Sequence, residues 1–284
     1  MFDVTIFGNA FAWRASNVLN TRPAAALGAT VTPGNNAKGS YAAVLTSGDM
    51  ARDAFGLLIN INSNAVSAAG RDAIVDIGID PAGGSSYTVK IPDLLGSCAS
   101  PYNVGQGGCW YYFPLWIRAG SSVGARASVN NATVGTLRVT ATAYGSPRNR
   151  KAIRVGTYVE AVGITAASSR GTTVTSGTTA EGAWTSLGTI ARDSWWWQLG
   201  MGVNDTTMSA LAYHADLAVG DATNKTNIIE NALVTTTAAE QLGIAPQYVD
   251  CQKVAPAGST VYGRLQCSGT ADSALSLAGY ALGG

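Results

Sequence analysis

The chain repeats itself over more than a hundred residues, and this repeat constrains the fold more than any other feature. The stretch GATVTPGNNAKGSYAAV, which begins at Gly28, returns as GTTVTSGTTAEGAWTSL from Gly171. Later, AGSSV at 119–123 returns as AGSTV at 257–261, and an arginine follows each stretch at the same distance. Two long copies are too few and too large for a solenoid. The sequence therefore predicts two related domains that arose by duplication.

The repeat also sets the expected domain limits. We expect an N-terminal arm at 1–27, a first domain at 28–146, a linker at 147–170 and a second domain at 171–284. The positions that match between the copies include Tyr41 and Trp184, the Ala-Arg-Asp triplets at 51–53 and 191–193, Asp76 and Asp216, and Arg126 and Arg264.

Within each copy the apolar residues follow the two-residue period of a strand with one buried face. In 55–61 every second residue is apolar, and its counterpart 195–203 alternates in phase. The segments 73–79 and 213–219 do the same, and 123–129 followed by 137–139 predicts a final pair of strands around an Asn-Asn turn. No segment has convincing helical spacing. The expected fold is all-β, with two tandem antiparallel β-sandwiches of jelly-roll type.

Composition limits the partners. Hydrophobic residues make up 46% of the chain and charged residues only 12%, against about 25% charged in a typical soluble domain. We therefore expect surface to be buried in an assembly. A net charge of +1 gives no field that would attract nucleic acid or an anionic membrane. No apolar run approaches the roughly 20 residues of a membrane helix, and the start lacks the pattern of a signal peptide, so we expect synthesis in the cytoplasm without signal-dependent export.

Three stretches carry a resemblance to a known group of proteins. ALGATVTPGNNAKGSY, ININSNAVSAAGRDAIVDIGID and FPLWIRAGSSVGARASVNNATVGTLRV resemble β-rich structural proteins of tailed bacteriophage virions, in which PAGS-type phrases precede an arginine on the next strand. The resemblance implies a virion component with other virion proteins as partners. It fits a capsid decoration, neck, tail or fibre protein equally well, and it supplies no catalytic residues.

A search for catalytic and metal sites favours a protein that is not an enzyme. The one histidine, His214, has an outward strand phase beside Asp216, where a solvated side chain is more common than a general base. No His or Cys cluster has metal-ligand spacing, and no cofactor motif is present. For the aspartates at expected strand ends, ordinary solvation is favoured over a weak cation site; these are Asp76, Asp80, Asp216 and Asp221.

The tryptophans offer two functional interpretations. Trp195 and Trp197 share the inward phase and are expected in the core, whereas Trp196 replaces Gly56 on the outward face. An outward aromatic ring serves either an assembly contact or a platform for a sugar. Trp110 and Tyr111 allow the same two interpretations, and assembly is favoured because exposed apolar patches on low-charge proteins usually mark interfaces.

These observations predict a homo-oligomer, for which a trimer is one option, that acts through contacts with other virion proteins. The apolar arm, with residues such as Phe2, Ile6 and Trp13, supports burial in such contacts. The alternative function is a receptor-binding adhesin that recognises a host surface glycan.

Four cysteines allow two intramolecular disulfides in mature particles. Cys98 and Cys109 flank a short Gly- and Pro-containing loop. Cys251 and Cys267 lie at equal distances from Ser259 in an expected hairpin, which would place them opposite each other on adjacent strands. The alternative is that all four stay reduced, because cytoplasmic synthesis disfavours disulfides.

Overall fold

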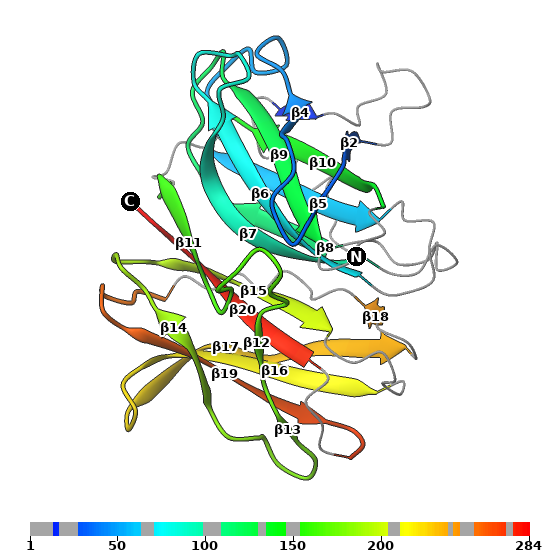
Figure 1. The fold of residues 1–284 in the computed structure, drawn as a ribbon. Helices are drawn as coiled ribbons and strands as arrows, with labels where there is room; N and C mark the ends of the chain where they lie inside the picture. The colour runs from blue at the N-terminus through cyan, green and yellow to red at the C-terminus, as the bar shows by residue number, and fades with distance from the viewer. Residues whose placement is uncertain are drawn as a thin grey trace.

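The computed structural model describes residues 14–16, 28–63, 71–98, 109–129, 135–145, 154–203, 211–237, 241–244, 253–270 and 275–284. The described part is built from strands and turns and contains no helix. Figure 1 shows two layered β structures, one formed by the first half of the chain and one by the second. The predicted all-β, sandwich-type fold is therefore confirmed.

The first half has two sheets. Sheet 1A contains β1 (Arg14–Ser16), β10 (Leu137–Tyr144), β5 (Gly56–Ser63) and β8 (Cys109–Phe113) in this order, and β2 (Ala29–Val31) also pairs with β10. Sheet 1B contains β3 (Gly34–Asn35), β9 (Ser122–Val129), β6 (Arg71–Asp80) and β7 (Thr88–Cys98), and β4 (Ala42–Leu45) also pairs with β9.

The second half also has two sheets. Sheet 2A contains β11 (Tyr158–Val162), β20 (Leu275–Gly283) and β12 (Thr172–Thr173), and β15 (Trp196–Val203) pairs with β20. Sheet 2B contains β13 (Ser176–Gly177), β19 (Thr260–Cys267), β16 (Ala212–Gly220), β17 (Lys225–Thr237) and β18 (Gln241–Ile244), and β14 (Thr185–Thr189) pairs with β19.

Most strand pairings occur in both halves. The short strands β3 and β13 run parallel to β9 and β19, whereas β4 and β14 pair with the same strands in antiparallel orientation. The pairing of β8 with β5 has no equivalent among the described residues, because β18 instead extends sheet 2B beside β17. Origin by duplication remains our interpretation of the repeat.

The matched triplets show why one aspartate is kept in both copies. The carboxylate of Asp53 accepts a hydrogen bond from the N–H of Ala119 at 2.7 Å. The carboxylate of Asp193 accepts one from the N–H of Ala257 at 2.8 Å. Each aspartate thus fixes the turn before β9 or β19, which explains why the AGS stretch and the Ala-Arg-Asp triplet recur together.

The final pair of strands is only partly as predicted. Residues 122–129 and 137–144 do form strands, β9 and β10. They do not pair with each other, because β9 lies in sheet 1B and β10 in sheet 1A. Alternation of apolar residues predicts that a strand has one buried face, and two strands facing each other across a core satisfy that pattern as well as a hairpin does.

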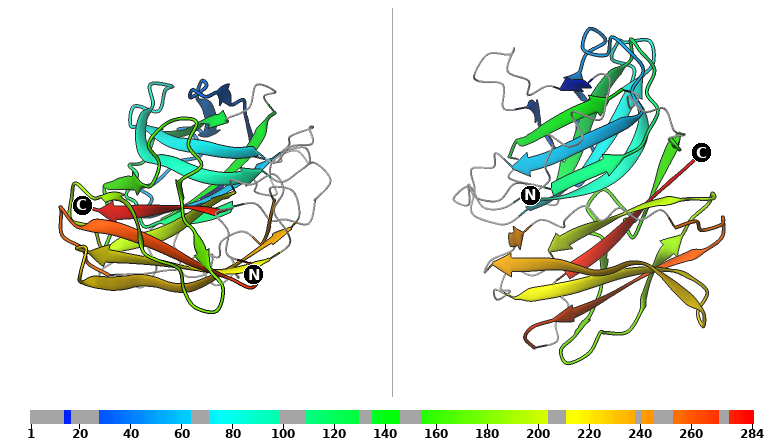
Figure 2. Two further views of the ribbon diagram at one scale, coloured as in Figure 1. Left: turned by 60° about the horizontal axis from the view of Figure 1, so that its bottom comes forward. Right: turned by 180° about the vertical axis from the view of Figure 1, so that it is seen from behind.

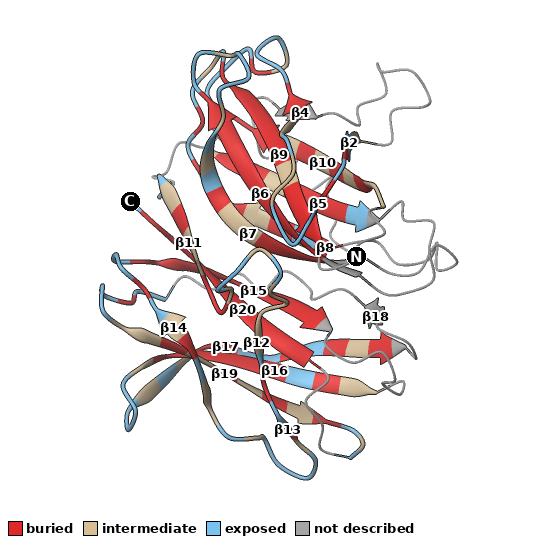
Figure 3. Cartoon of the chain, viewed as in Figure 1, coloured by how far each residue is buried: buried red, intermediate tan, exposed pale blue. Residues whose placement is uncertain are grey.

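Sheet 2A contributes side chains to the cores of both halves. Along β20, Leu275, Leu277 and Ala281 belong to the core of the second half, whereas Ala278, Tyr280 and Leu282 belong to the core of the first. Every residue of β20 is therefore buried (Figure 3). Figure 1 and the right view of Figure 2, seen from opposite sides, show β20 on the side of the second sandwich that faces the first. The halves are consequently joined by apolar packing as well as by the chain.

The predicted linker and arm are wrong in part. Residues 158–162, which we assigned to the linker, form β11 at the edge of sheet 2A, and 14–16 of the arm form β1 on sheet 1A. The segment before β11 is also fixed: the N–H of Gly156 donates to the carbonyl of Pro114 at 2.8 Å, and that of Thr157 donates to Gly283 at 2.9 Å. The remaining residues of 1–27 and 147–153 lie outside the described part.

Candidate functional site

Each half contains a buried carboxylate bound by an arginine that stacks on an aromatic ring. In the first half, the Nε of Arg126 donates to Asp76 at 2.9 Å, and the guanidinium lies 4.9 Å from the centre of the Tyr41 ring. In the second half, Arg264 donates to Asp216 at 2.9 Å and lies 4.3 Å from the centre of the Trp184 ring. These residues match in the repeat.

The same carboxylates hold a backbone bulge on the neighbouring strand. Asp76 accepts the N–H of Asp93 at 3.0 Å, and Asp216 accepts that of Asn231 at 2.6 Å. Asp93 and Asn231 have φ of 55° and 52°, a left-handed conformation that Asp and Asn tolerate better than most residues. The expectation of solvated aspartates is therefore wrong for Asp76 and Asp216, which are buried because their oxygens are saturated.

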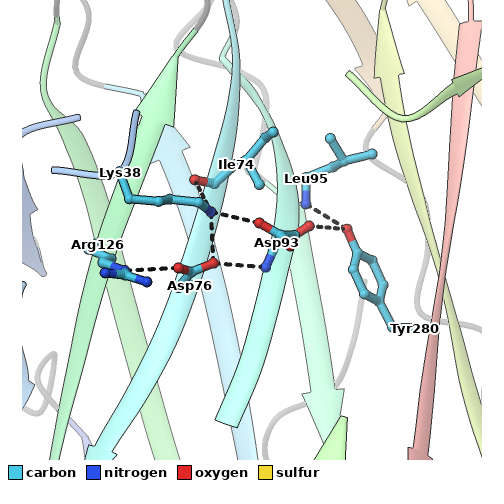
Figure 4. A network of polar contacts seen from close by, with 7 residues as sticks. All are labelled: Lys38, Ile74, Asp76, Asp93, Leu95, Arg126 and Tyr280. Carbon is cyan, nitrogen blue, oxygen red and sulfur yellow. Dashed lines mark hydrogen bonds and ion pairs between the residues drawn. The ribbon is translucent and has the colours of Figure 1, made fainter. Parts of the chain in front are cut away.

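The two networks differ in charge. In the first, Lys38 bridges Asp76 at 2.7 Å and Asp93 at 2.9 Å, as Figure 4 shows. Burial alone would raise the pKa of Asp76, but the ion pair with Lys38 and the donors of Asp93 and Arg126 outweigh burial and lower it. Because every carboxylate of this cluster has a cation, its net charge is close to zero.

The second network has Glu181 where the first has Lys38. Glu181 and Asp216 share one guanidinium, because Arg264 contacts both through its Nη2 atom. Burial and the neighbouring Asp216 raise the pKa of Glu181 despite this arginine. In both clusters the charged side chains bind one another and the backbone, so they stabilise the fold.

The junction between the halves is a second polar constellation. The Tyr280 hydroxyl accepts the N–H of Leu95 at 2.7 Å and donates to the carbonyl of Asp93 at 2.9 Å (Figure 4). Tyr111 also donates to the carbonyl of Leu95, at 2.5 Å, and meets the Tyr280 ring edge to face at 5.4 Å. Burial raises the pKa of Tyr280 well above its usual range, so the hydroxyl stays protonated as a donor.

Side chains of β15 bind the edge strand β8. The amide of Gln198 accepts the N–H of Tyr112 at 3.2 Å and donates to its carbonyl, which Trp196 Nε1 also reaches at 3.2 Å. An uncovered edge strand presents unpaired backbone groups and invites association with another sheet. The second half thus caps this edge of the first.

The structure corrects two of the predicted aromatic sites. Trp196 does have the outward phase, but it is buried against the first half, so it is neither a sugar platform nor a contact for another chain. Tyr111 is buried as well. Trp197 lies in the core as expected, and Trp195 is buried but in the core of the first half. Trp110 is 41% exposed, as predicted.

Other exposed positions were partly missed. Trp116 is 45% exposed, although the sequence pattern did not single it out. Its neighbours Leu115 and Ile117 are buried, so the alternation along 115–117 could have identified it. His214 is exposed, as expected from its phase, and Asp221 caps an exposed turn by accepting the N–H groups of Thr223 and Asn224. The expectation of solvation is also wrong for Asp80, which is buried and whose carboxylate accepts the N–H groups of Ala82 and Ser86.

The cysteine pairs remain predictions. Cys109 and Cys267 are buried, and the Sγ of Cys267 lies 3.2 Å from the carbonyl of Thr270. Cys251 and the side chain of Cys98 lie outside the described residues. The hairpin that suggested the Cys251–Cys267 pair is wrong, because β19 has β16 on one side and β13 and β14 on the other. Non-reducing peptide mapping tests both pairs.

One cleft lies at the junction of the halves. It has a volume of about 380 Å³ and is lined by residues of β7, β11 and the segment after β14: Val89, Lys90, Pro92, Tyr158, Val159, Glu160, Ala191 and Arg192. Burial, and the nearby Glu160, raise the pKa of Tyr158. Among the described residues, no three metal-ligating side chains are grouped to hold an ion, and no helix could span a membrane.

Comparisons with known proteins give no family. No family model matches the sequence, and no curated protein matches it. Similar solved structures include PNGF-II in two space groups, P21 and C2, with TM-scores of 0.40 and 0.35 and 10% identity. The matches cover 99% and 91% of this chain and 67% and 65% of those chains. Infectious bursal disease virus Gx strain matches with a TM-score of 0.22 and 12% identity, over 95% of this chain and 70% of that chain.

Proposed function

We propose that the chain is a non-enzymatic structural component of a tailed-phage virion that acts through oligomerisation and protein contacts. The proposal rests on the resemblance of the three stretches quoted above. The observation that supports it best is the exposure of Trp116 on a chain with few charges. A large apolar side chain that is exposed on a single chain usually marks a surface that a partner covers in the assembly.

The use of the polar residues also fits a structural role. The matched carboxylates, with their arginines, bind the backbone of the bulges, and the junction tyrosines join the two halves. The fixed segment around Gly156 adds to the same joint. A subunit that transmits contacts through an assembly benefits from halves that cannot hinge freely.

Solution mass tests the oligomer. Light scattering after size exclusion should give a mass above the 29.0 kDa of one chain, and Trp116→Ser should shift it toward the monomer. Val254→Ser is the matched control, because Val254 is also exposed, at 63%, but lies in the second half. A monomeric wild type at about 100 µM, well above the Kd of a specific interface, would contradict the proposal.

Particle composition tests the location. Particles purified from a phage whose genome encodes the chain should contain it at a constant number of copies per particle. Antibodies against the chain should label one part of the virion. If the chain is absent from washed particles, the virion assignment fails even when the protein oligomerises.

The second candidate is an adhesin for a host surface glycan, and the exposure of Trp110 favours it. A flat aromatic ring suits the apolar face of a sugar as well as a protein contact. A glycan array separates the two: selective and saturable binding that is lost in Trp110→Ser supports the adhesin, whereas a stable oligomer without such Trp110-dependent binding supports the structural role.

A further inference from the structure

We propose that the cleft between the halves binds the carboxylate-bearing ring of an acidic sugar. This goes beyond the structural role proposed above and does not depend on the oligomer. The cleft lies between β7 of the first half and β11 of the second, and its volume of about 380 Å³ is within the range of small-ligand sites, which occur preferentially at domain interfaces.

The wall formed by the second half is fixed in place. Glu160 accepts the N–H of Ala191 at 3.1 Å and that of Arg192 at 3.4 Å. The hydroxyl of Tyr158 donates to the carbonyl of Asp193 at 2.6 Å. Because β11 thus holds the segment 191–193 at successive residues, the cleft is formed before any ligand arrives, which lowers the entropy cost of binding.

Arg192 is oriented for a carboxylate. Its guanidinium lies 4.6 Å from the centre of the Tyr158 ring. Stacking on a ring occupies the flat face of a guanidinium and leaves the N–H groups, which point outward in its plane, available for a bidentate acceptor. The Glu160 carboxylate is turned to the backbone of the loop, and no ion pair of Arg192 occurs among the described residues.

A second cation faces the cleft from the other half. Lys90 on β7 is exposed and has no ion pair in the described part of the chain. The cleft is therefore lined by two cations, Arg192 and Lys90, and by one carboxylate, that of Glu160. The excess positive charge favours an anionic ligand. The partly exposed side chains of Val89 and Pro92 add apolar surface to the lining, which suits the C–H groups of a pyranose ring.

The repeat supplies a matched control. Arg52 occupies the position of Arg192 in the first copy, within the same Ala-Arg-Asp triplet. It is exposed and does not line the cleft. Arg52→Gln removes the same charge from the same local sequence, and it should not change ligand binding.

The experiment is a titration of the isotope-labelled full chain with sodium D-glucuronate, at constant ionic strength and up to about 50 mM, followed by amide chemical shifts. We expect saturable shifts at cleft residues such as Val89 and Ala191, none with D-glucose, and weaker shifts with acetate. Arg192→Gln and Lys90→Gln should each weaken glucuronate binding by about tenfold or more, whereas Arg52→Gln should not.

Several results would overturn the proposal. They are the absence of saturable shifts, equal shifts with acetate, or equal weakening by Arg52→Gln. Lys90→Gln keeps the test valid if Arg192→Gln disturbs the loop, because no described contact depends on the lysine. Light scattering on the same variants should show the wild-type mass, so loss of sugar binding is distinguishable from failure of the assembly.

Discussion

Replacing Tyr280 with phenylalanine isolates the hydroxyl that joins the two halves. The ring stays in place, together with its edge-to-face contact with Tyr111. What is lost is the acceptor for the N–H of Leu95 and the donor to the carbonyl of Asp93, at 2.7 and 2.9 Å. The perturbation therefore removes two hydrogen bonds and little apolar contact.

The magnitude follows from burial. Leu95 and Tyr280 are fully buried, so water cannot replace the lost partner. An orphaned buried donor costs about 1–3 kcal/mol, and an under-satisfied carbonyl costs less because it has two lone pairs. We expect the free energy of unfolding to fall by about 2–3 kcal/mol and the melting temperature to fall by roughly 3–5 °C for a chain of this length.

Urea unfolding followed by tryptophan fluorescence measures the loss, and hydrogen exchange of the Leu95 amide locates it. Tyr262→Phe is the control, because Tyr262 is partly exposed and its hydroxyl has no hydrogen bond among the described residues. A loss below about 0.5 kcal/mol, the range of ordinary surface changes, or one equal to the control, would refute the role of the hydroxyl.

Three further outcomes are expected. Acid should destabilise the first half, because folding lowers the pKa of Asp76. The stability that ionised Asp76 contributes is fully present above the unfolded carboxyl pKa near 4 and is lost as the pH falls through the folded pKa. Hydrogen exchange around β6 at pH 7 and 3 measures this loss. The raised pKa of Glu181 has the opposite sign, so Glu181→Gln should stabilise the chain at pH 7 and have no effect below about pH 4, as urea unfolding at both values would show. Trp196→Ala should cost about 3–5 kcal/mol because the ring is buried, whereas Trp116→Ala should cost less than about 1 kcal/mol in the same urea assay.

The strands could be predicted from the sequence because alternation is a local property. The phase along 196–203 correctly places Trp197, Leu199 and Met201 in the core of the second half and Trp196 on the other face of the sheet. Its burial could not be predicted, because the residues that cover it, such as Tyr112, come from the other half of the chain. The cleft was missed for the same reason, since its walls come from three distant segments.

Other errors had signals in the sequence. Adjacent strand residues point to opposite faces, so Trp110 and Tyr111 could not both be exposed platforms. The repeat preserves Asp76 together with Arg126, and Asp216 together with Arg264. A carboxylate and an arginine kept as a pair in two copies are better explained by an ion pair than by separate solvation, and the structure shows that pair in both halves.

The differences between the copies follow from the junction. In the first half the bulge residue is Asp93, whose carbonyl accepts the Tyr280 hydroxyl and whose carboxylate binds Lys38. In the second half the bulge residue is Asn231, and Glu181 replaces the lysine.

The bulge at Asp93 accepts a hydrogen bond from the other half, so it must keep its strand edge in one position. The ion pair with Lys38 holds it from the side opposite to Tyr280 (Figure 4). The bulge of the second half has no equivalent of Tyr280 among the described residues, so a weaker network with a surplus carboxylate is sufficient there. The lysine thus lies in the half whose bulge accepts the Tyr280 hydroxyl, and the glutamate lies in the other half.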